Sequence, residues 1–250
     1  MQMITLKTAR ELETMKVACR ISAEALQRGG EAVRPGITTR ELDKIIHDYI
    51  LSQGAVPSFL GYGGFPGSAC ISVNEEVIHG IPGDRVIRPG DIVSIDVGAA
   101  KDGYTGDNAG TFAAGTASPE AVRLMEATKE SLRRAIAAAQ PGNRIGDISY
   151  AVQSYIEEQG FSVVRKFVGH GVGRELHEDP EVPNFGRAGR GVRLLPGMTL
   201  AIEPMVNAGD AQVKTLSNHW TVVTADGKLS AHFEHSIAIT SNGPVVLTSL

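Results

Sequence analysis

The 250-residue sequence is poor in several features that would mark a specialised class of protein. Its two cysteines, Cys19 and Cys70, are not in a CxxC pair, which argues against a disulfide framework, a thiolate zinc site and a dithiol redox motif. No run of 18 or more apolar residues occurs, and the first residues lack the apolar region of a secretory signal, so a soluble cytoplasmic protein is expected. With 24 Lys and Arg against 28 Asp and Glu, the net charge is −4, so neither DNA nor an anionic membrane is an expected partner.

An internal repeat organises the chain. Residues 24–54 and 130–160 are identical at ten of 31 positions, where composition alone would give roughly two. Residues 89–96 also align with residues 196–203, at an offset one residue longer than that of the first pair of segments, and each copy ends in an acid. We therefore expect one catalytic domain, residues 1–250, made of pseudo-symmetric halves at roughly residues 1–114 and 115–250.

Each half is predicted to contain two helices followed by an antiparallel sheet. Capping boxes at Thr8–Glu11 and Thr38–Glu41, and the pair Ser118-Pro119, mark helix starts. Apolar residues at three- and four-residue spacing continue the second helix of each half as far as Gly54 and Gly160.

Two β-rich runs, residues 91–97 and 198–203, predict strands, and Asp-Gly turns at 102–103 and 226–227 predict a hairpin in each half. The fold class is therefore α+β, with helices outside and a curved antiparallel sheet within.

The first Asp-Gly turn brings two acids together. In a two-residue hairpin Asp96 faces Ala109, and Asp107 is a diagonal neighbour of Asp96 at about 7 Å. Two carboxylates on the core face of a sheet repel each other and lose solvation unless a cation compensates. The alternative is a pair of exposed acids on a solvated hairpin, and the hairpin alone does not decide between the two.

The second half adds further candidate ligands. His170 lies between glycines, and Glu203 and Glu234 lie in apolar strand contexts. Each one alone fits an ordinary loop histidine or strand-end acid. With the two hairpin aspartates they make a set of four carboxylates and one imidazole, which suits a pair of Mn, Fe, Co or Zn ions better than a structural zinc site.

Five sets of motifs resemble those of the type I methionine aminopeptidases, metallopeptidases of the pita-bread fold. The resemblance covers essentially all 250 residues, and its motifs are Val77–Pro82, Ser94–Val97 with Tyr104–Asp107, Gly169–Gly171 with His177–Pro180, Ile202–Pro204, and Phe233–Ser236. It implies that the ligands of two divalent metal ions are Asp96, Asp107, His170, Glu203 and Glu234, with Asp107 and Glu234 bridging.

The resemblance also implies removal of the initiator methionine from nascent polypeptides whose second residue is small. A hydroxide bridging the two metals would attack the scissile carbonyl. Glu203 would carry the proton to the leaving amine, and His177 and His79 would contact the carbonyl oxygen and amide of the substrate. Without the other motifs, His79 would be interpreted as a histidine satisfied in a Gly-Pro turn.

The family places the walls of its methionine pocket at positions matching Phe59, Tyr62, Phe65, Cys70 and Trp220. Leu176 stands where relatives often carry phenylalanine, and an ordinary aromatic core is the alternative interpretation. A hairpin at 226–227 would place Trp220 opposite Phe233, on the face away from Glu234, so that Trp220 would reach the site only through a β-bulge.

Other functions compete with this one. The proline-directed peptidases, prolidase and aminopeptidase P, resemble the sequence in its ligand set but usually carry an additional N-terminal domain, for which the first repeat leaves no room. A non-catalytic binding protein on the same scaffold would have lost ligands, whereas all five are present. The arginine-containing loop at residues 186–193 is either a solvated loop or a site of transient contact with ribosomal RNA phosphates. A monomer is expected, because there is no heptad pattern.

Overall fold

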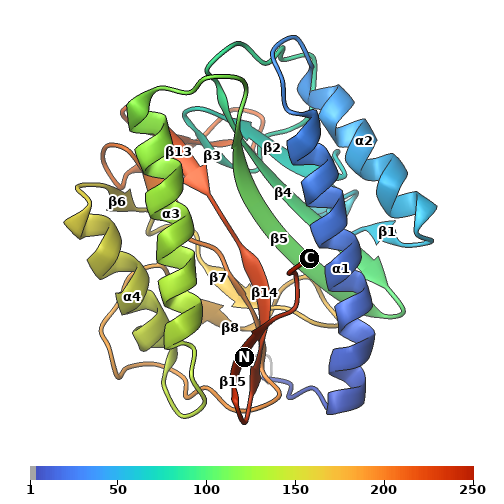
Figure 1. The fold of residues 1–250 in the computed structure, drawn as a ribbon, viewed down its shortest axis with the longest axis vertical. Coiled ribbons are helices and arrows are strands. Elements are labelled where there is room, and N and C mark those ends of the chain that lie inside the picture. Colours follow the sequence, from blue (N-terminus) through green and yellow to red (C-terminus); the bar gives the residue numbers. More distant parts are fainter. Residues whose placement is uncertain (1–3) are drawn as a thin grey trace.

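The computed structural model describes residues 4–250, with helices along the outside and strands between them (Figure 1). The α-helices of this part of the chain are α1 (Ala9–Ala32), α2 (Thr39–Ser52), α3 (Pro119–Ala138) and α4 (Ile145–Glu158), and a short 3-10 helix is η1 (Tyr62–Gly64). In Figure 1, both helix pairs lie in front of the strands, with α1 and α2 over the right half and α3 and α4 over the left half.

The strands of residues 4–250 form four sheets, and every pairing between them is antiparallel. One sheet contains β1 (Val56–Pro57), β2 (Ala69–Val73), β4 (Ile92–Lys101) and β5 (Tyr104–Ala113). The five-stranded sheet contains β7 (Gly169–Gly171), β8 (Glu178–Val182), β9 (Thr199–Ile202), β14 (His235–Thr240) and β15 (Gly243–Val246). One of the two smaller sheets contains β6 (Ser162–Val163), β10 (Met205–Asn207) and β13 (Ser230–His232). The other contains β3 (Glu76–Ile78), β11 (Val213–Thr215) and β12 (Val222–Thr224).

The predicted helix starts are confirmed. The Thr8 side chain accepts a hydrogen bond from the backbone N–H of Glu11, whose carboxylate accepts from the Thr8 N–H in return. The same reciprocal pair begins α2, and the Ser118 hydroxyl caps α3. The helices α2 and α4 end just before Gly54 and Gly160, whose φ angles of 61° and 79° lie in the left-handed region that glycine adopts without strain.

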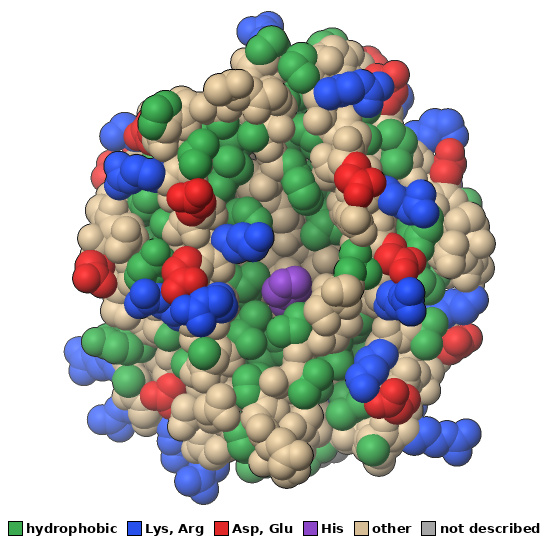
Figure 2. Space-filling model, in the orientation of Figure 1, with side chains coloured by type: hydrophobic (Ala, Val, Ile, Leu, Met, Phe, Trp, Pro, Cys, Tyr) green, Lys and Arg blue, Asp and Glu red, His purple; other side chains and the backbone are tan. Residues whose placement is uncertain are grey.

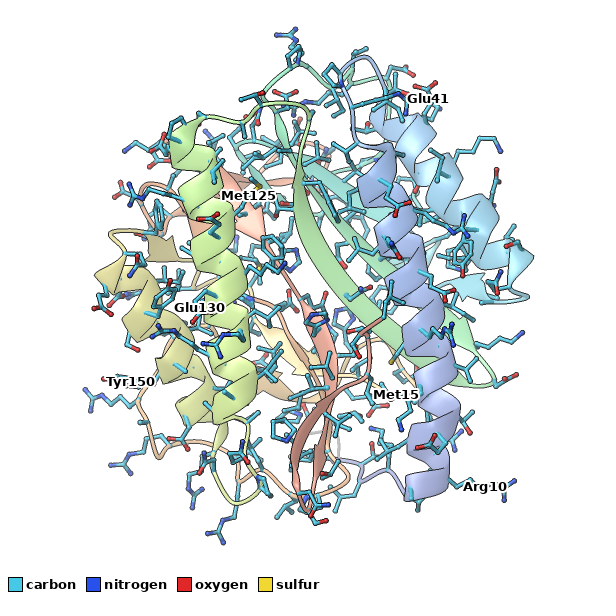
Figure 3. The ribbon with its side chains drawn as sticks, in the orientation of Figure 1. Arg10, Met15, Glu41, Met125, Glu130 and Tyr150 are labelled. Atoms are coloured by element: carbon cyan, nitrogen blue, oxygen red, sulfur yellow. The ribbon has the colours of Figure 1, made fainter. Side chains whose placement is uncertain are left out.

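The helices bury the faces that their spacing predicts. Leu42, Ile46 and Ile50 of α2 are fully buried against the β2–β4 side, and the apolar face of α4 is buried in a second cluster beneath α3. In Figure 3, Arg10 and Tyr150 project outward from their helices, whereas Met15 lies between α1 and the strands behind it. The two helix pairs therefore act as outer covers, which leaves the other face of the strands free to form a site.

The first predicted hairpin is confirmed, and it lies at the centre of the fold. Asp96 faces Ala109 and Gly98 faces Asp107 across β4 and β5, as a turn at 102–103 requires. The outer edge of β5 joins the second half of the chain, since the Asp107 N–H donates to the Ser236 hydroxyl at 3.1 Å. The division into halves at residue 114 stays a prediction.

The second predicted hairpin is wrong. The Asp226-Gly227 turn does join β12 to β13, but β12 pairs with β11 and β3, whereas β13 pairs with β10. The Asp226 carboxylate accepts hydrogen bonds from the backbone N–H groups of Asp210 and Lys228. These bonds hold the turn, although the strands on either side of it do not pair with each other. An Asp-Gly pair specifies a local turn, but the choice of partner strand depends on packing farther away. The predicted placement of Trp220 opposite Phe233 depended on this hairpin and is therefore wrong as well.

The surface is mixed in charge. On the face shown in Figure 2, basic and acidic side chains are interspersed over the helices, with apolar side chains in the valley between them. Cys19 and Cys70 are free and buried. Within the described part of the chain, none of the helices combines the length and apolar character that crossing a bilayer would require.

Candidate metal centre

Five side chains, on strands or directly beside them, meet where the two large sheets approach each other. Asp96 lies in the middle of β4, Asp107 in β5 and His170 in the middle of β7. Glu203 directly follows β9, and Glu234 lies in the link between β13 and β14. Backbone bonds fix these positions, because the Glu234 N–H donates to the Ala109 carbonyl at 2.9 Å, and Ala109 is the partner of Asp96. All five side chains line one pocket.

The distances within the cluster suit a shared cation. The ligand atoms of Asp107, His170 and Glu234 all lie within 4.8 Å of one another. His170 Nε2 lies 3.7 Å from Asp107 Oδ2 and 3.5 Å from Glu203 Oε1. His170 Nδ1 lies 2.8 Å from the Gly171 carbonyl, so its proton belongs on Nδ1 and the Nε2 lone pair faces the carboxylates.

The carboxylates are buried and incompletely hydrogen-bonded. Asp107 is 3% exposed and Asp96 is only partly exposed, so the two hairpin acids are not a solvated pair, and Glu234 is 2% exposed. One oxygen each of Asp96, Asp107 and Glu234 is buried without a hydrogen-bond partner. Buried oxygens of this kind cost free energy unless a cation satisfies them. The donor set of carboxylates and one imidazole therefore fits divalent metal ions.

Burial dominates the electrostatics of the cluster. It raises the pKa of Asp96 to about 7 and the pKa of Glu203 to about 8. Burial and the neighbouring carboxylates raise the pKa values of Asp107 and Glu234 well above their ordinary range. Burial lowers the pKa of His170 to about 3, so its imidazole is neutral and available as a ligand at neutral pH. Without a cation the acids retain protons, and a bound cation would release them.

An apolar pocket opens above the carboxylates. Its walls include every side chain that the sequence predicted for it: Phe59, Tyr62, Phe65, Cys70 and Trp220. Trp220 reaches the pocket from the turn before β12 and packs edge-to-face on Phe65, with 5.2 Å between ring centroids. Leu176 belongs to the same apolar cluster. The whole pocket, with its carboxylate end included, has a cavity volume of about 210 Å³, which is below the usual range of small-molecule sites, so its apolar part suits a single side chain.

The two further histidines flank the metal centre on the pocket side. His177 is exposed at the pocket mouth, where its Nδ1 lies 2.8 Å from the Tyr62 hydroxyl and its ring centroid 4.2 Å from that of His170. His79 has a φ of 57°, in the left-handed region that non-glycine residues rarely adopt. Burial, aided by neighbouring histidines, lowers the pKa of His79 to about 4, so its ring is neutral at pH 7.

His232 is a site residue that the sequence analysis missed. It is 1% exposed, and its Nε2 lies 3.5 Å from Glu203 Oε2 without a closer partner. The sequence held one signal for it, namely a histidine two residues before Glu234 in a strand context, where period-two spacing places both on one side. The pocket also contains Ile78, Phe167 and Val168, which were not singled out as pocket residues.

The geometry can be compared with that of known proteins. A model of metallopeptidase family M24 matches residues 13–241. The chain belongs to metallopeptidase family M24.

Several members of family M24 are similar over nearly the whole chain. Methionine aminopeptidase 1 of Bacillus subtilis is 55% identical over 246 residues, which cover 98% of this chain and 99% of the relative. The crystal structure of a methionine aminopeptidase from Thermotoga maritima superposes with a TM-score of 0.98 at 46% identity, covering 99% of this chain and 100% of that one. Prolidase from Pyrococcus furiosus gives a TM-score of 0.78 at 25% identity, and the match covers 98% of this chain but 65% of that one.

These M24 relatives confirm the predicted resemblance to methionine aminopeptidases, the pita-bread fold and the metallo-aminopeptidase class. They favour methionine aminopeptidase over the proline-directed peptidases, because both identity and coverage of the partner chain are higher. The metal ligands and the substrate-contacting residues remain predictions for this chain.

Proposed function

We propose that this chain removes the N-terminal methionine from polypeptides whose second residue is small, using two divalent ions held by the five predicted ligands. The observation that supports this proposal is a pocket of one-side-chain size that ends on buried carboxylates with unpartnered oxygens. A pocket of this kind accepts an apolar side chain and places the adjoining backbone at the carboxylates. Ions bound there would supply a nucleophilic water at neutral pH and polarise the scissile carbonyl.

The side chains of the chain itself have distinct roles in this proposal. Glu203 faces His170 with one oxygen and His232 with the other, so its carboxylate is positioned to take a proton from the attacking water and pass it to the leaving amine. His177 at the mouth donates to the carbonyl oxygen as negative charge develops, and His79 contacts the substrate amide.

The pocket walls determine which residue enters. The thioether of methionine is polarizable and pairs well with aromatic rings, and Phe59, Phe65 and Trp220 surround the cavity with such rings. The pocket admits one side chain, so it holds the first residue of the substrate. The free amine of that residue lies among the carboxylates, which favours cleavage at the chain terminus.

The test uses short peptides and one matched pair of variants. We expect release of free methionine from Met-Ala-Ser with added Mn²⁺ or Co²⁺, loss of this activity after chelation, and no release from Met-Lys-Ser or Ala-Pro peptides. Elemental analysis is expected to find two ions per chain. Asp107→Asn should lose bound metal and activity, whereas Asp102→Asn, at the exposed turn of the same hairpin, should keep both.

Different outcomes separate the competing functions. Cleavage of the Ala-Pro peptide would indicate a proline-directed peptidase. Absence of any hydrolysis by metal-loaded protein would favour a binding protein. Full activity of Asp107→Asn would contradict the assigned ligands. The ion used in the cell, whether Co, Mn, Fe or Zn, is tested by anomalous diffraction on protein purified without added metal.

We further infer that the substrate is the start of a new polypeptide and that the enzyme acts in the cytoplasm. Arg187, Arg190 and Arg193 are exposed in the loop at residues 186–193, which supports a transient contact with ribosomal RNA phosphates. Cosedimentation with ribosomes that weakens as salt rises is expected. Salt-insensitive cosedimentation, or none at low salt, would contradict an electrostatic contact.

A further inference from the structure

The loop that carries His177 is held by the N-terminal segment of the chain. Residues 172–177 connect β7 to β8 without helix or strand. Glu178, the residue after His177, forms an ion pair with Lys7, which lies just before α1. The Lys7 and Glu178 side chains are 5% and 12% exposed, unlike the exposed ion pairs along the helices.

Both oxygens of Glu178 are occupied, and they organise the loop. Oε2 accepts hydrogen bonds from Lys7 Nζ and from the Thr5 hydroxyl, the latter at 3.0 Å. Oε1 accepts from the backbone N–H of Arg174 at 2.7 Å and from that of Glu175 at 3.2 Å. One carboxylate therefore ties the N-terminal segment to the backbone of the loop that presents His177.

Lys7 is itself fixed in place. Its N–H donates to the Gly197 carbonyl at 2.7 Å, and its side chain passes directly over Gly173. A Cβ at Gly173 would lie 2.5 Å from Lys7 Cε and 2.7 Å from Glu178 Oε1, so a side chain there would push the ends of the ion pair aside. The other side of Gly173 is anchored as well, because its carbonyl accepts from the Thr105 N–H at 2.7 Å.

The Glu178 carboxylate retains its charge despite burial. Burial by itself would raise the pKa of Glu178, but the hydrogen bonds and the charge of Lys7 outweigh it, and the pKa lies below its ordinary value. A buried ion pair is weak evidence for stability, because apolar side chains of similar volume often stabilise as well or better. Its structural effect here is to define one arrangement of a loop that has no regular secondary structure.

We propose that the Lys7–Glu178 ion pair is a positioning device for His177, holding the imidazole at the pocket mouth where it meets the developing charge of the substrate. The proposal rests on the proposed role of His177. The Tyr62 hydroxyl holds His177 Nδ1 at 2.8 Å from one side, and Glu178 fixes the backbone from the other. Displacement of a catalytic group by about 1 Å can cost about 100-fold in rate, so the pair affects turnover without touching the substrate.

The test is a double-mutant cycle with methionine release from Met-Ala-Ser in saturating Mn²⁺. Lys7→Met is expected to lower kcat by about 10–100-fold and to change KM by less than about 3-fold, because the pocket walls are unaltered. In the His177→Ala background, the same Lys7→Met change is expected to lower kcat by less than about 2-fold, because the group that it positions is already absent. Lys16→Met, which breaks an exposed pair on α1, serves as the control and should match the parent.

The outcomes separate the two proposals. If His177→Ala keeps full activity, the role of His177 in the proposed function is wrong. If His177→Ala is impaired but Lys7→Met lowers kcat by the same factor in both backgrounds, the ion pair has only a structural role and this inference is wrong. Thermal unfolding and metal content are measured for each variant. Should Lys7→Met fold poorly, Lys7→Met/Glu178→Gln, which removes both charges, takes its place in the same cycle.

Discussion

The metal centre predicts that the chelated protein loses stability as pH rises above neutrality. Asp96 and Glu203 have ordinary pKa values of 3.8 and 4.5, and burial in the folded protein raises these to about 7 and about 8. The folded state therefore binds more protons than the unfolded state up to about pH 8, and this contribution to stability is lost as pH rises through the folded pKa values. Mn²⁺ should remove the loss, because a cation binds the deprotonated carboxylates.

The useful pH window follows from the histidines. Burial lowers the pKa values of His79 and His235 to about 4 and that of His170 to about 3. A lowered histidine pKa has the opposite sign, since its contribution is lost as pH falls, and it is nearly complete only from about pH 7.5, one unit above the histidine pKa of about 6.5 in the unfolded chain. Between pH 7.5 and 9 the carboxylates therefore dominate, with a loss of about 1 kcal/mol that comes mainly from Glu203, and Asp107 and Glu234 act in the same direction. For a chain of this size the melting temperature should fall by at least about 2–4 °C.

The measurement is thermal unfolding by circular dichroism at constant ionic strength, from pH 7.5 to 9, in chelator and in excess Mn²⁺. Asp96→Asn should melt above the parent at pH 8.5 in chelator, because a buried charge is gone, and it should gain less from Mn²⁺. Asp102→Asn, at the exposed turn, should follow the parent. A melting temperature of the chelated parent that stays level or rises across this range would refute the reasoning that these carboxylates share a buried, cation-dependent site.

Three further predictions concern individual contacts. His232→Leu should lower kcat about 10-fold, while His232→Gln, whose amide can donate to Glu203 Oε2, should stay within about 3-fold of the parent; equal losses in methionine release would contradict a hydrogen-bonding role. Trp220→Ala should raise KM for Met-Ala-Ser about 10-fold with little change in kcat, as expected for a pocket wall that packs on Phe65, and a loss confined to kcat would contradict this. Gly106→Ala should destabilise by about 3 kcal/mol in urea unfolding, because its Cβ would lie 2.3 Å from Cys19 Cα, whereas Gly83→Ala, with nothing nearer than 4.0 Å, should not.

Sequence alone predicted the local structure well, because local structure depends on neighbours along the chain. A capping box needs residues three apart, and both Thr8 and Thr38 begin helices as expected. The Asp102-Gly103 turn fixes its own register, and this was enough to place Asp96 opposite Ala109. The metallo-aminopeptidase class was accessible because its motifs are short and contiguous.

Tertiary structure decided how distant segments meet. The Asp226-Gly227 turn has the same local chemistry as the first, yet its flanking strands pair elsewhere, and Trp220 reaches the pocket by a path that no pairing rule predicts. His232 and Lys7 acquire their places beside Glu203 and Glu178 through contacts that span many residues. A side chain's own neighbours in sequence specify its backbone conformation, but the free energy of burying it depends on what the rest of the fold brings against it.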